Sequence, residues 1–274
     1  MLNFLTWDMD PAIFSIGSLE IRYYGLLWAS SFWLGYLLIK KMYLKEGIKE
    51  ALLDPLLYAV LIGAVLGARL GHVFFYDFDW YFTVNNVEEK SHMLSVLNIR
   101  EGGLASHGGA IGVIIGIWWY SKFKIKRSML WVLDRMVIAG ALAGAFIRVG
   151  NFFNSEIVGV PTEKPWGIVF TYLGENFARH PAQLYEALAY TVVLVLLLFL
   201  YKKKKLVAQE GKMFGLFLMV VFTARFFIEF IKNSQHGIES YFGDVLSTGQ
   251  LLSIPFVLIG AFFMVRKSTK MDHQ

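Results

Sequence analysis

Seven apolar stretches of nearly twenty residues follow one another along this chain of 274 residues. A helix needs about twenty consecutive apolar residues to cross the hydrocarbon core of a bilayer. Soluble domains do not repeat such runs, so the sequence predicts an all-α polytopic membrane protein with seven transmembrane helices. The expected spans are about 21–39, 55–76, 104–121, 129–150, 182–201, 213–231 and 248–265. One membrane bundle accounts for the length, so residues 1–274 are expected to form a single transmembrane domain.

The basic residues of the loops predict how these spans are oriented. Sixteen of them fall on one side: Lys40, Lys41, Lys45, Lys49, Lys122, Lys124, Lys126, Arg127, Lys202, Lys203, Lys204, Lys205, Lys212, Arg266, Lys267 and Lys270. Six fall on the other: Arg22, Lys90, Arg100, Lys164, Arg179 and Lys232. Cytoplasmic loops carry the excess of Lys and Arg, so the N-terminus is expected outside and the C-terminus in the cytoplasm. The outer loops, about 77–103 and 151–181, should form a small extracytoplasmic cap.

Composition and missing motifs exclude several functions. The net charge of +5 resides in short loops, where it signals topology, and nucleic-acid binding is not expected. Cysteine is absent, which excludes disulfides and thiolate nucleophiles. The sequence lacks His-Glu-x-x-His, Gly-x-Ser-x-Gly and Walker motifs, so we expect no metal, no cofactor, no serine hydrolysis and no ATP use. The N-terminus has no basic cluster typical of a cleaved signal peptide.

The segment from Arg148 to Glu156 joins an arginine to two asparagines, a serine and a glutamate at the end of the fourth span. A lone arginine there could simply extend to the lipid interface. It could also form an anion site at membrane depth. Arg69 and Arg225 favour the anion site, because both lie on other outward-running spans.

At 1.5 Å per residue the three arginines lie about 21 Å (Arg69), 18 Å (Arg225) and 28 Å (Arg148) from the inner ends of their spans, in the outer half of the bilayer. Glu229 follows Arg225 by four residues on one helical face and can pair with it. A purely structural ion pair is the alternative at that position.

The third span begins with a glycine-rich segment containing His107, Gly108 and Gly109. Its N-terminus faces the outer leaflet, and backbone N–H groups without side chains suit a phosphate. The alternative is close helix packing, because Gly108, Gly112 and Gly116 are spaced by four. The same spacing at Gly63-Gly67-Gly71 and Gly140-Gly144 suggests that spans two to four form one tight core.

Further polar groups lie at the outer level of other spans. Gln183 and Glu186 share one face at the start of the fifth span, and Tyr24 lies at the start of the first. A cationic, hydrogen-bonding site at phosphate depth inside an apolar bundle fits a phospholipid headgroup best. The residues expected to contribute are Tyr24, Arg69, His107, Arg148, Asn151, Glu156, Gln183, Glu186, Arg225 and Glu229.

The motifs carrying these residues resemble the prolipoprotein diacylglyceryl transferases of bacteria over nearly the whole chain. The matching segments are Asp10-Pro-x-Ile-Phe-Ser-Ile-Gly17, Arg22-Tyr-Tyr-Gly25, Gly67-Ala-Arg69, Gly102-Gly-x-x-x-His-Gly-Gly109, Arg148-x-Gly-Asn-Phe-x-Asn-x-Glu156, Arg179-His-Pro-x-Gln-Leu-Tyr-Glu186, Arg225-Phe-Phe-Ile-Glu229 and Gly249-Gln-x-Leu-Ser-Ile-Pro255. The segment from Arg148 to Glu156 is the family's signature. The segment between Gly159 and Arg179 matches least, being short here.

The resemblance implies transfer of the diacylglyceryl group of phosphatidylglycerol to the lipobox cysteine of a prolipoprotein signal peptide, with a thioether formed and glycerol phosphate released. It implies that Arg148 and Arg225 bind the phosphate and stabilise the departing group, and that His107 is a candidate base for the thiol. Asn151, Glu156 and Glu229 would hold the arginines and the lipid. The other substrate-binding positions implied are Tyr24, Arg69, Gly108, Gly109, Gly159, Gln183 and Glu186. A transporter or flippase for an anionic lipid or small anion is the alternative from another class.

Overall fold

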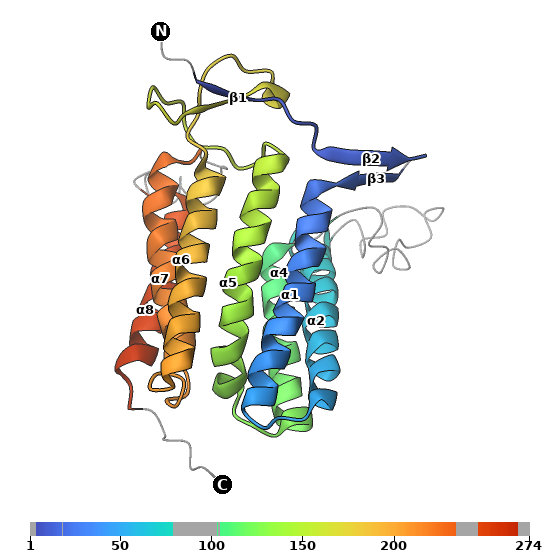
Figure 1. Cartoon of the computed structure of the whole chain (residues 1–274), viewed down its shortest axis with the longest axis vertical. Helices are drawn as coiled ribbons and strands as arrows, with labels where there is room; N and C mark the ends of the chain where they lie inside the picture. Colours follow the sequence, from blue (N-terminus) through green and yellow to red (C-terminus); the bar gives the residue numbers. More distant parts are fainter. Residues whose placement is uncertain (1–3, 18, 79–102, 104, 234–245, 268–274) are drawn as a thin grey trace. The chain divides into compact units, whose positions relative to one another are not determined.

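The computed structural model describes residues 4–17, 19–78, 103, 105–233 and 246–267. Each of the seven predicted stretches contains a helix (Figure 1). These helices are α1 (Tyr23–Lys45), α2 (Leu53–Phe75), α4 (Ser106–Trp119), α5 (Met129–Phe153), α6 (Ala182–Lys203), α7 (Lys212–Ile228) and α8 (Thr248–Val265). Short 3₁₀ turns cover Glu50–Leu52 (η1), Thr171–Leu173 (η5) and Glu229–Ile231 (η6), and a π-helical turn covers Tyr120–Ile125 (η4).

Within the described ranges, five helical segments are long and apolar enough to cross a membrane. They are Glu50–Phe75, Met129–Phe153, Ala182–Lys203, Lys212–Ile231 and Thr248–Val265. The chain is therefore mostly helical, as the apolar runs predicted. The count of seven spans and the orientation of the termini stay predictions.

Four short strands correct the all-α prediction. Strand β1 (Leu5–Trp7) pairs in parallel with β4 (Ile168–Phe170), and β2 (Ala12–Ile16) pairs antiparallel with β3 (Leu19–Arg22). Each strand has only three to five residues, too few for a pattern that distinguishes a strand from a loop. The β1–β4 pair also joins segments more than 150 residues apart, which local patterns do not reveal.

The chain divides into two compact units. Unit 1 contains residues 1–39 and 133–274, and unit 2 contains residues 40–132. The prediction of a single domain over residues 1–274 stays a prediction. The expected outer loop 77–103 lies mostly outside the described residues, whereas the loop 151–181 is described and belongs to unit 1.

Glycines bring the helices of unit 1 close together. Gly215 of α7 faces Gly260 of α8, where an added Cβ would lie 2.7 to 2.9 Å from the opposite carbonyl oxygen. Gly144 of α5 packs against the ring of Tyr190 on α6. An added Cβ at Gly140 would meet no atom within 4 Å. The prediction that the fourth span shares one core with spans two and three stays a prediction.

Asp134, in the second turn of α5, anchors the start of α7. Its carboxylate accepts hydrogen bonds from the backbone N–H of Gly211 at 2.7 Å and of Phe214 at 2.8 Å. A carboxylate at a helix N-terminus satisfies N–H groups that have no partner within the helix and complements the helix dipole. Asp134 is fully buried, so it serves as an N-terminal cap supplied by a neighbouring helix.

Unit 2 is organised by the packing of α2 against α4. Glycines 63, 67 and 71 of α2 face glycines 108 and 112 of α4, and Gly116 faces Ala59. An added Cβ on Gly112 would overlap the carbonyl oxygen of Gly63, so these backbones touch directly. The prediction of close glycine packing is confirmed for spans two and three. Small residues at such intervals are what allow membrane helices to approach closely.

Candidate functional site

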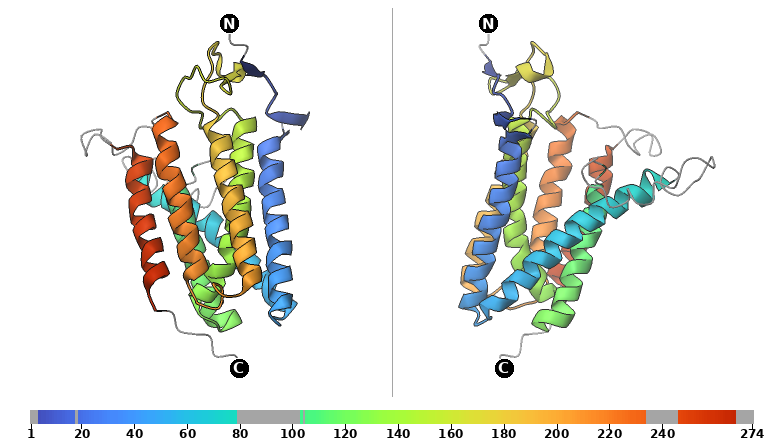
Figure 2. Two further views of the ribbon diagram at one scale, coloured as in Figure 1. Left: turned by 60° about the vertical axis from the view of Figure 1, so that its left-hand side comes forward. Right: turned by 90° about the vertical axis from the view of Figure 1, so that its right-hand side faces the viewer.

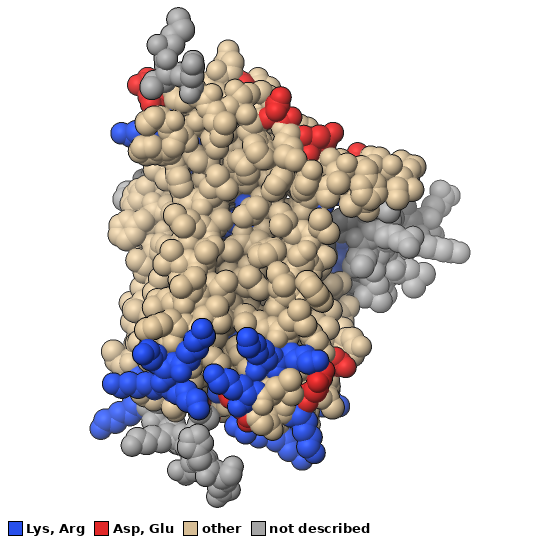
Figure 3. All heavy atoms as spheres, viewed as in Figure 1, with Lys and Arg blue, Asp and Glu red and all other residues tan. Residues whose placement is uncertain are grey.

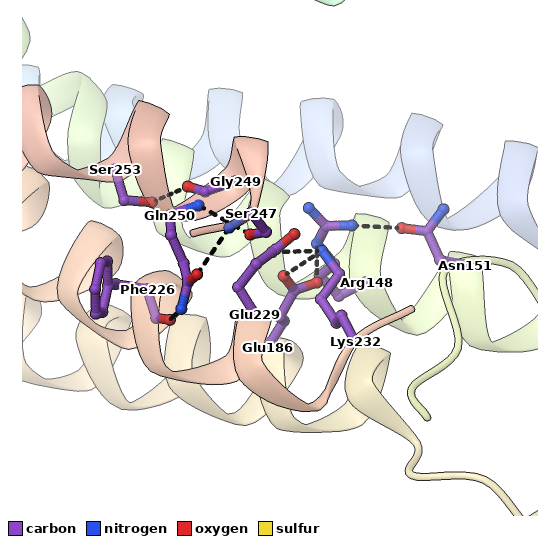
Figure 4. Close-up of polar contacts among 10 residues, drawn as sticks. All are labelled: Arg148, Asn151, Glu186, Phe226, Glu229, Lys232, Ser247, Gly249, Gln250 and Ser253. Carbon is purple, nitrogen blue, oxygen red and sulfur yellow. Dashed lines mark hydrogen bonds and ion pairs between the residues drawn. The ribbon is translucent and has the colours of Figure 1, made fainter. Parts of the chain in front are cut away.

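Arg148 lies near the end of α5, where two groups fix its guanidinium. Its Nε is 2.8 Å from Oε2 of Glu186 on α6, and its Nη1 donates to Oδ1 of Asn151 at 3.3 Å (Figure 4). The side chain of Glu186 is 5% exposed and that of Arg148 is 16% exposed. A buried charge needs such compensation, because an isolated ion is costly to remove from water. A guanidinium carries five N–H donors, so Arg148 has donors beyond these two contacts that a ligand could use.

The turn after α5 folds Glu156 back onto Asn151. The Nδ2 groups of Asn151 and Asn154 each donate to the Glu156 carboxylate at 3.1 Å, and Nε2 of Gln183 donates to the Glu156 carbonyl at 2.6 Å. Ser155 and Ile157 adopt positive φ angles of 53° and 56°, which are unfavourable for residues with a Cβ. Asn151 thus bridges a cation and a carboxylate, as only a side chain with both an acceptor and a donor can.

Lys232 completes a second ionic contact at Glu186. Its Nζ lies 3.5 Å from Oε1 of Glu186 and 3.2 Å from Oε2 of Glu229 (Figure 4). Sequence reasoning counted Lys232 among the basic residues of the outer loops, and its side chain is only 5% exposed. Its position three residues after Glu229 and seven after Arg225 was the signal that could have placed it on their helical face.

The predicted pairing of Arg225 with Glu229 is wrong. The α-helix ends at Ile228, and Glu229 begins the tighter turn η6, in which residues three apart lie one above the other. Glu229 therefore pairs with Lys232, and its carboxylate lies against Gly249 of α8. Within the described part of the chain, Arg225 forms no ion pair with a carboxylate, and its buried Nε has no hydrogen-bond partner.

Arg225 and Arg148 line one small pocket of unit 1. Its walls come from α5, α6 and α7: Arg148, Glu186, Ala189, Tyr190, Val221, Ala224, Arg225 and Ile228. Two guanidinium groups and apolar side chains at one opening suit an anionic group attached to an apolar body. The structure thus brings together two of the three predicted arginines.

Tyr24, Gln183 and Gly159 are further predicted residues that lie in unit 1. Tyr24 packs over Gly150 and lies within electrostatic range of Arg148 and Glu156. Gln183 is fully buried at the start of α6. Gly159 passes so close to Ile231 and His180 that a Cβ would lie 2.5 to 2.6 Å from their atoms, and its N–H donates to the His180 carbonyl at 2.8 Å. Close backbone packing therefore explains Gly159, and its role in substrate binding stays a prediction.

Four predicted residues lie in unit 2. Arg69 is buried in α2, and its Nη1 donates to the Gly103 carbonyl at 3.3 Å. His107 is exposed in the first turn of α4, at the level of Arg69, because the N–H of Ala105 bonds to the carbonyl of Ala68 at 2.9 Å.

Packing explains the two glycines that follow His107. Gly108 is covered by Gly67 and Gly71 of α2, where an added Cβ would lie 2.7 Å from the Gly71 Cα. The N–H of Gly109 donates to Ala105 at 3.0 Å within the helix. Both observations favour close helix packing over the anion cradle, and the substrate role of Gly108 and Gly109 stays a prediction.

Sequence reasoning missed a His–Asp pair in unit 2. The Nε2 of His72 lies 2.7 Å from Oδ2 of Asp77, and the His72 ring covers Gly103, whose φ is 71°. His72 and Asp77 are five residues apart, and an uninterrupted helix does not bring side chains at that spacing together. They meet because α2 ends at Phe75 and the chain turns back, with the N–H of Asp77 bonded to the His72 carbonyl at 3.3 Å. Within the described ranges, no cluster of three His, Cys, Asp or Glu residues could hold a metal ion.

Fold and site together define a protein with several membrane-spanning helices and a buried pair of arginines held by carboxylates and an asparagine. A family model described as prolipoprotein diacylglyceryl transferase matches residues 11–266. The chain belongs to this family.

Similar proteins match over nearly their full length. A protein of Tolumonas auensis is 44% identical over 261 residues, covering 95% of this chain and 96% of its own. One of Chloroherpeton thalassium is 40% identical over 263 residues, covering 96% and 94%. One of Porphyromonas gingivalis is 41% identical over 275 residues, covering 96% of this chain and 94% of its own. All three are named phosphatidylglycerol–prolipoprotein diacylglyceryl transferase.

Proposed function

We propose that this chain is the transferase that moves the diacylglyceryl group of phosphatidylglycerol to the lipobox cysteine of prolipoprotein signal peptides. The thiol sulfur forms a thioether to the glycerol carbon, the bond from that carbon to the phosphate oxygen breaks, and glycerol phosphate leaves with the electron pair. The reaction is the first step of bacterial lipoprotein maturation. The observation that carries the proposal is the pocket with Arg148 and Arg225 in a chain that belongs to this family.

The pocket supports the role proposed for the two arginines. Arg225 has no carboxylate partner within the described residues, and Arg148 has more N–H donors than its contacts with Glu186 and Asn151 use. A phosphate diester that becomes a leaving monoester gains negative charge, which two guanidinium groups in an apolar setting stabilise more strongly than water does. Glu186 and Asn151 would hold Arg148 in place, while Glu156 orients Asn151.

His107 is proposed as the base that takes the proton of the thiol. Its exposed position in the first turn of α4 supports this role, because an imidazole open to a bound substrate can accept the proton of a thiol. Tyr24, Arg69, Gly108, Gly109, Gly159, Gln183 and Glu229 are proposed to complete the lipid site. We propose no metal or cofactor for this chemistry.

The proposed setting is the bacterial inner membrane, crossed seven times by one domain, with the N-terminus and a small cap outside. The uneven distribution of basic loop residues supports this orientation. Figure 3 shows lysine and arginine side chains gathered at the lower end of the view, the end at which Figure 1 shows α6 giving way to α7. The transporter alternative is not favoured, because relatives matching nearly the whole chain carry a transferase name.

Purified protein tests the proposal when it is incubated with glycerol-labelled phosphatidylglycerol and a lipobox peptide. The expected product is a peptide heavier by one diacylglyceryl group, together with glycerol phosphate in equal amount. A peptide with serine in place of the lipobox cysteine is the matched control and should stay unmodified. Release of glycerol phosphate without modified peptide would indicate a lipid hydrolase and contradict the proposal.

A further inference from the structure

The hairpin formed by β2 and β3 is amphipathic. The register places Phe14 opposite Ile21 and Ser15 opposite Glu20. Side chains alternate between the two faces of a strand, so Phe14, Ile16 and Ile21 lie on one face, and Ser15, Glu20 and Arg22 lie on the other. Glu20 and Arg22 form an ion pair of 2.7 Å on this polar face.

The apolar face of the hairpin has no protein partner among the described residues. Phe14 is 53% exposed and Ile16 is 66% exposed, and β2 and β3 form a two-stranded sheet by themselves. Such a hairpin is marginal in water unless its apolar face packs against something. By contrast, Trp7 of the neighbouring strand β1 packs on Phe152 with ring centroids 4.4 Å apart. The apolar face of the hairpin therefore lacks the kind of protein contact that Trp7 makes.

The position of the hairpin identifies this partner as lipid. Strand β3 continues directly into α1, and the N–H of Tyr23 bonds to the Pro11 carbonyl at the hairpin base. The Tyr23 ring stacks on Phe153, the last residue of α5, with centroids 4.6 Å apart. Because α5 is a candidate membrane span, the hairpin lies level with the end of a span. Both ribbon figures show it extending sideways from the start of α1 (Figures 1 and 2).

We propose that the β2–β3 hairpin lies in the membrane interface, with Phe14, Ile16 and Ile21 toward the acyl chains and the Glu20–Arg22 pair toward water. A lipid surface accepts an apolar face at this depth while the opposite face stays hydrated. The hairpin anchors the start of α1 and with it Tyr24, which packs over Gly150 beside Arg148. The inference holds for either orientation of the protein.

The absence of native cysteine makes a direct test possible. Single cysteines at Phe14 and Ile16, and control cysteines at Ser15 and Glu20 on the opposite face, are labelled with a bimane fluorophore. Each full-length protein is reconstituted in phosphatidylglycerol and phosphatidylethanolamine vesicles, with shallow nitroxide lipids in both leaflets. The nitroxide lipids should quench the fluorescence at positions 14 and 16 at least about two-fold more than at positions 15 and 20. The reason is that an interfacial element buries its apolar face roughly 5–10 Å deep.

Two results would overturn the proposal. Equal quenching of all four positions by aqueous iodide would mean that the hairpin stands in water. Protection of positions 14 and 16 from both iodide and nitroxide lipid would mean that protein covers them. Cross-linking from Phe14→Cys would then identify residues 79–102, a second copy or the bound peptide as the cover. Two positions on each face keep the test valid if one variant fails to fold.

Discussion

The charged network of unit 1 and the glycine contacts of unit 2 hold helices together by opposite means. In unit 1, Glu186 joins Arg148 of α5 to Lys232, which follows α7, across distances of 2.8 and 3.5 Å. In unit 2, α2 and α4 meet because Gly63 and Gly112 have no side chains. Charged groups of the first region line a pocket, whereas the backbones at Gly63 and Gly112 touch directly and leave no space for a ligand between them. Substitutions in the charged network should accordingly affect activity, and substitutions at the glycine contacts should affect folding.

His107 tests whether unit 2 contributes chemistry in addition to packing, and we expect the largest effect there. His107→Gln should lower the transfer rate by roughly 10²–10⁴-fold, the usual loss when a positioned base is removed. Binding of phosphatidylglycerol should be unchanged, because the phosphate contacts are proposed for Arg148 and Arg225. Single-turnover rates and lipid binding measured on the same preparation check this. An unchanged rate with an unchanged acidic limb of the pH–rate profile would reduce His107 to a positioning residue.

Arg225→Lys tests the network of unit 1. A lysine ammonium cannot present the planar fork that holds a phosphate, so kcat/KM should fall by about 10²–10³-fold. The thermal unfolding midpoint should change little, since Arg225 forms no ion pair within the described residues. Arg22→Lys is the matched control, because its ion pair with Glu20 is half-exposed and Arg22 does not line the pocket. Full activity of Arg225→Lys would contradict the proposed phosphate contact.

Gly112→Ala tests the glycine contacts of unit 2. The added methyl group would lie 2.9 Å from the Gly67 Cα and overlap Gly63, so the helices must separate. We expect a loss of about 1–3 kcal/mol in the free energy of unfolding, the usual cost of overpacking. Gly109→Ala is the control, because its nearest neighbours are 3.4 Å away. Equal unfolding transitions of the two variants in denaturant would show that the contact does not govern stability.

The smallest expected effect concerns pH and the loop 159–181. The indole N–H of Trp166 donates to the Tyr185 hydroxyl at 2.9 Å, and this hydroxyl lies 3.0 Å from Nδ1 of His180. Partial burial, and then the charge of Lys164, lower the pKa of His180 below 6.5. As the pH falls, His180 therefore takes up its proton in the unfolded loop before it does so in the folded loop. The stability of the folded loop is fully present above pH 6.5 and is lost as the pH falls through the pKa of His180 in the folded state.

Hydrogen exchange of the loop 159–181 between pH 7.5 and pH 5 measures this loss. Protection should decrease toward pH 5 in the native protein and change less in His180→Gln. The same decrease in both proteins would assign the pH dependence to another group.

The helices and the core of the site were predictable because their signals are local. The apolar runs predict all seven helical stretches, and Arg148, Asn151 and Glu156 lie within one turn and the loop that follows it. Lys232 was not predictable as a buried residue, since its burial depends on Glu186 from another helix. The pairing of Glu229 failed because a change from α to 3₁₀ geometry at Ile228 redirects the side chain.

The cap that Asp134 of α5 supplies to α7 fixes the start of α7 beside one residue of α5, so positions along both helices can be counted from this contact. Arg148 lies fourteen residues beyond Asp134 on α5, and Arg225 lies fourteen residues beyond Gly211 at the start of α7. Both helices run in the same direction from this anchor (Figures 1 and 2), so each guanidinium stands about 21 Å along its helix. Inserting one residue in either helix would turn its arginine by about 100° relative to the other. The relative height of the two arginines proposed to bind phosphate is thus set by helix length, counted from the opposite end of the two helices.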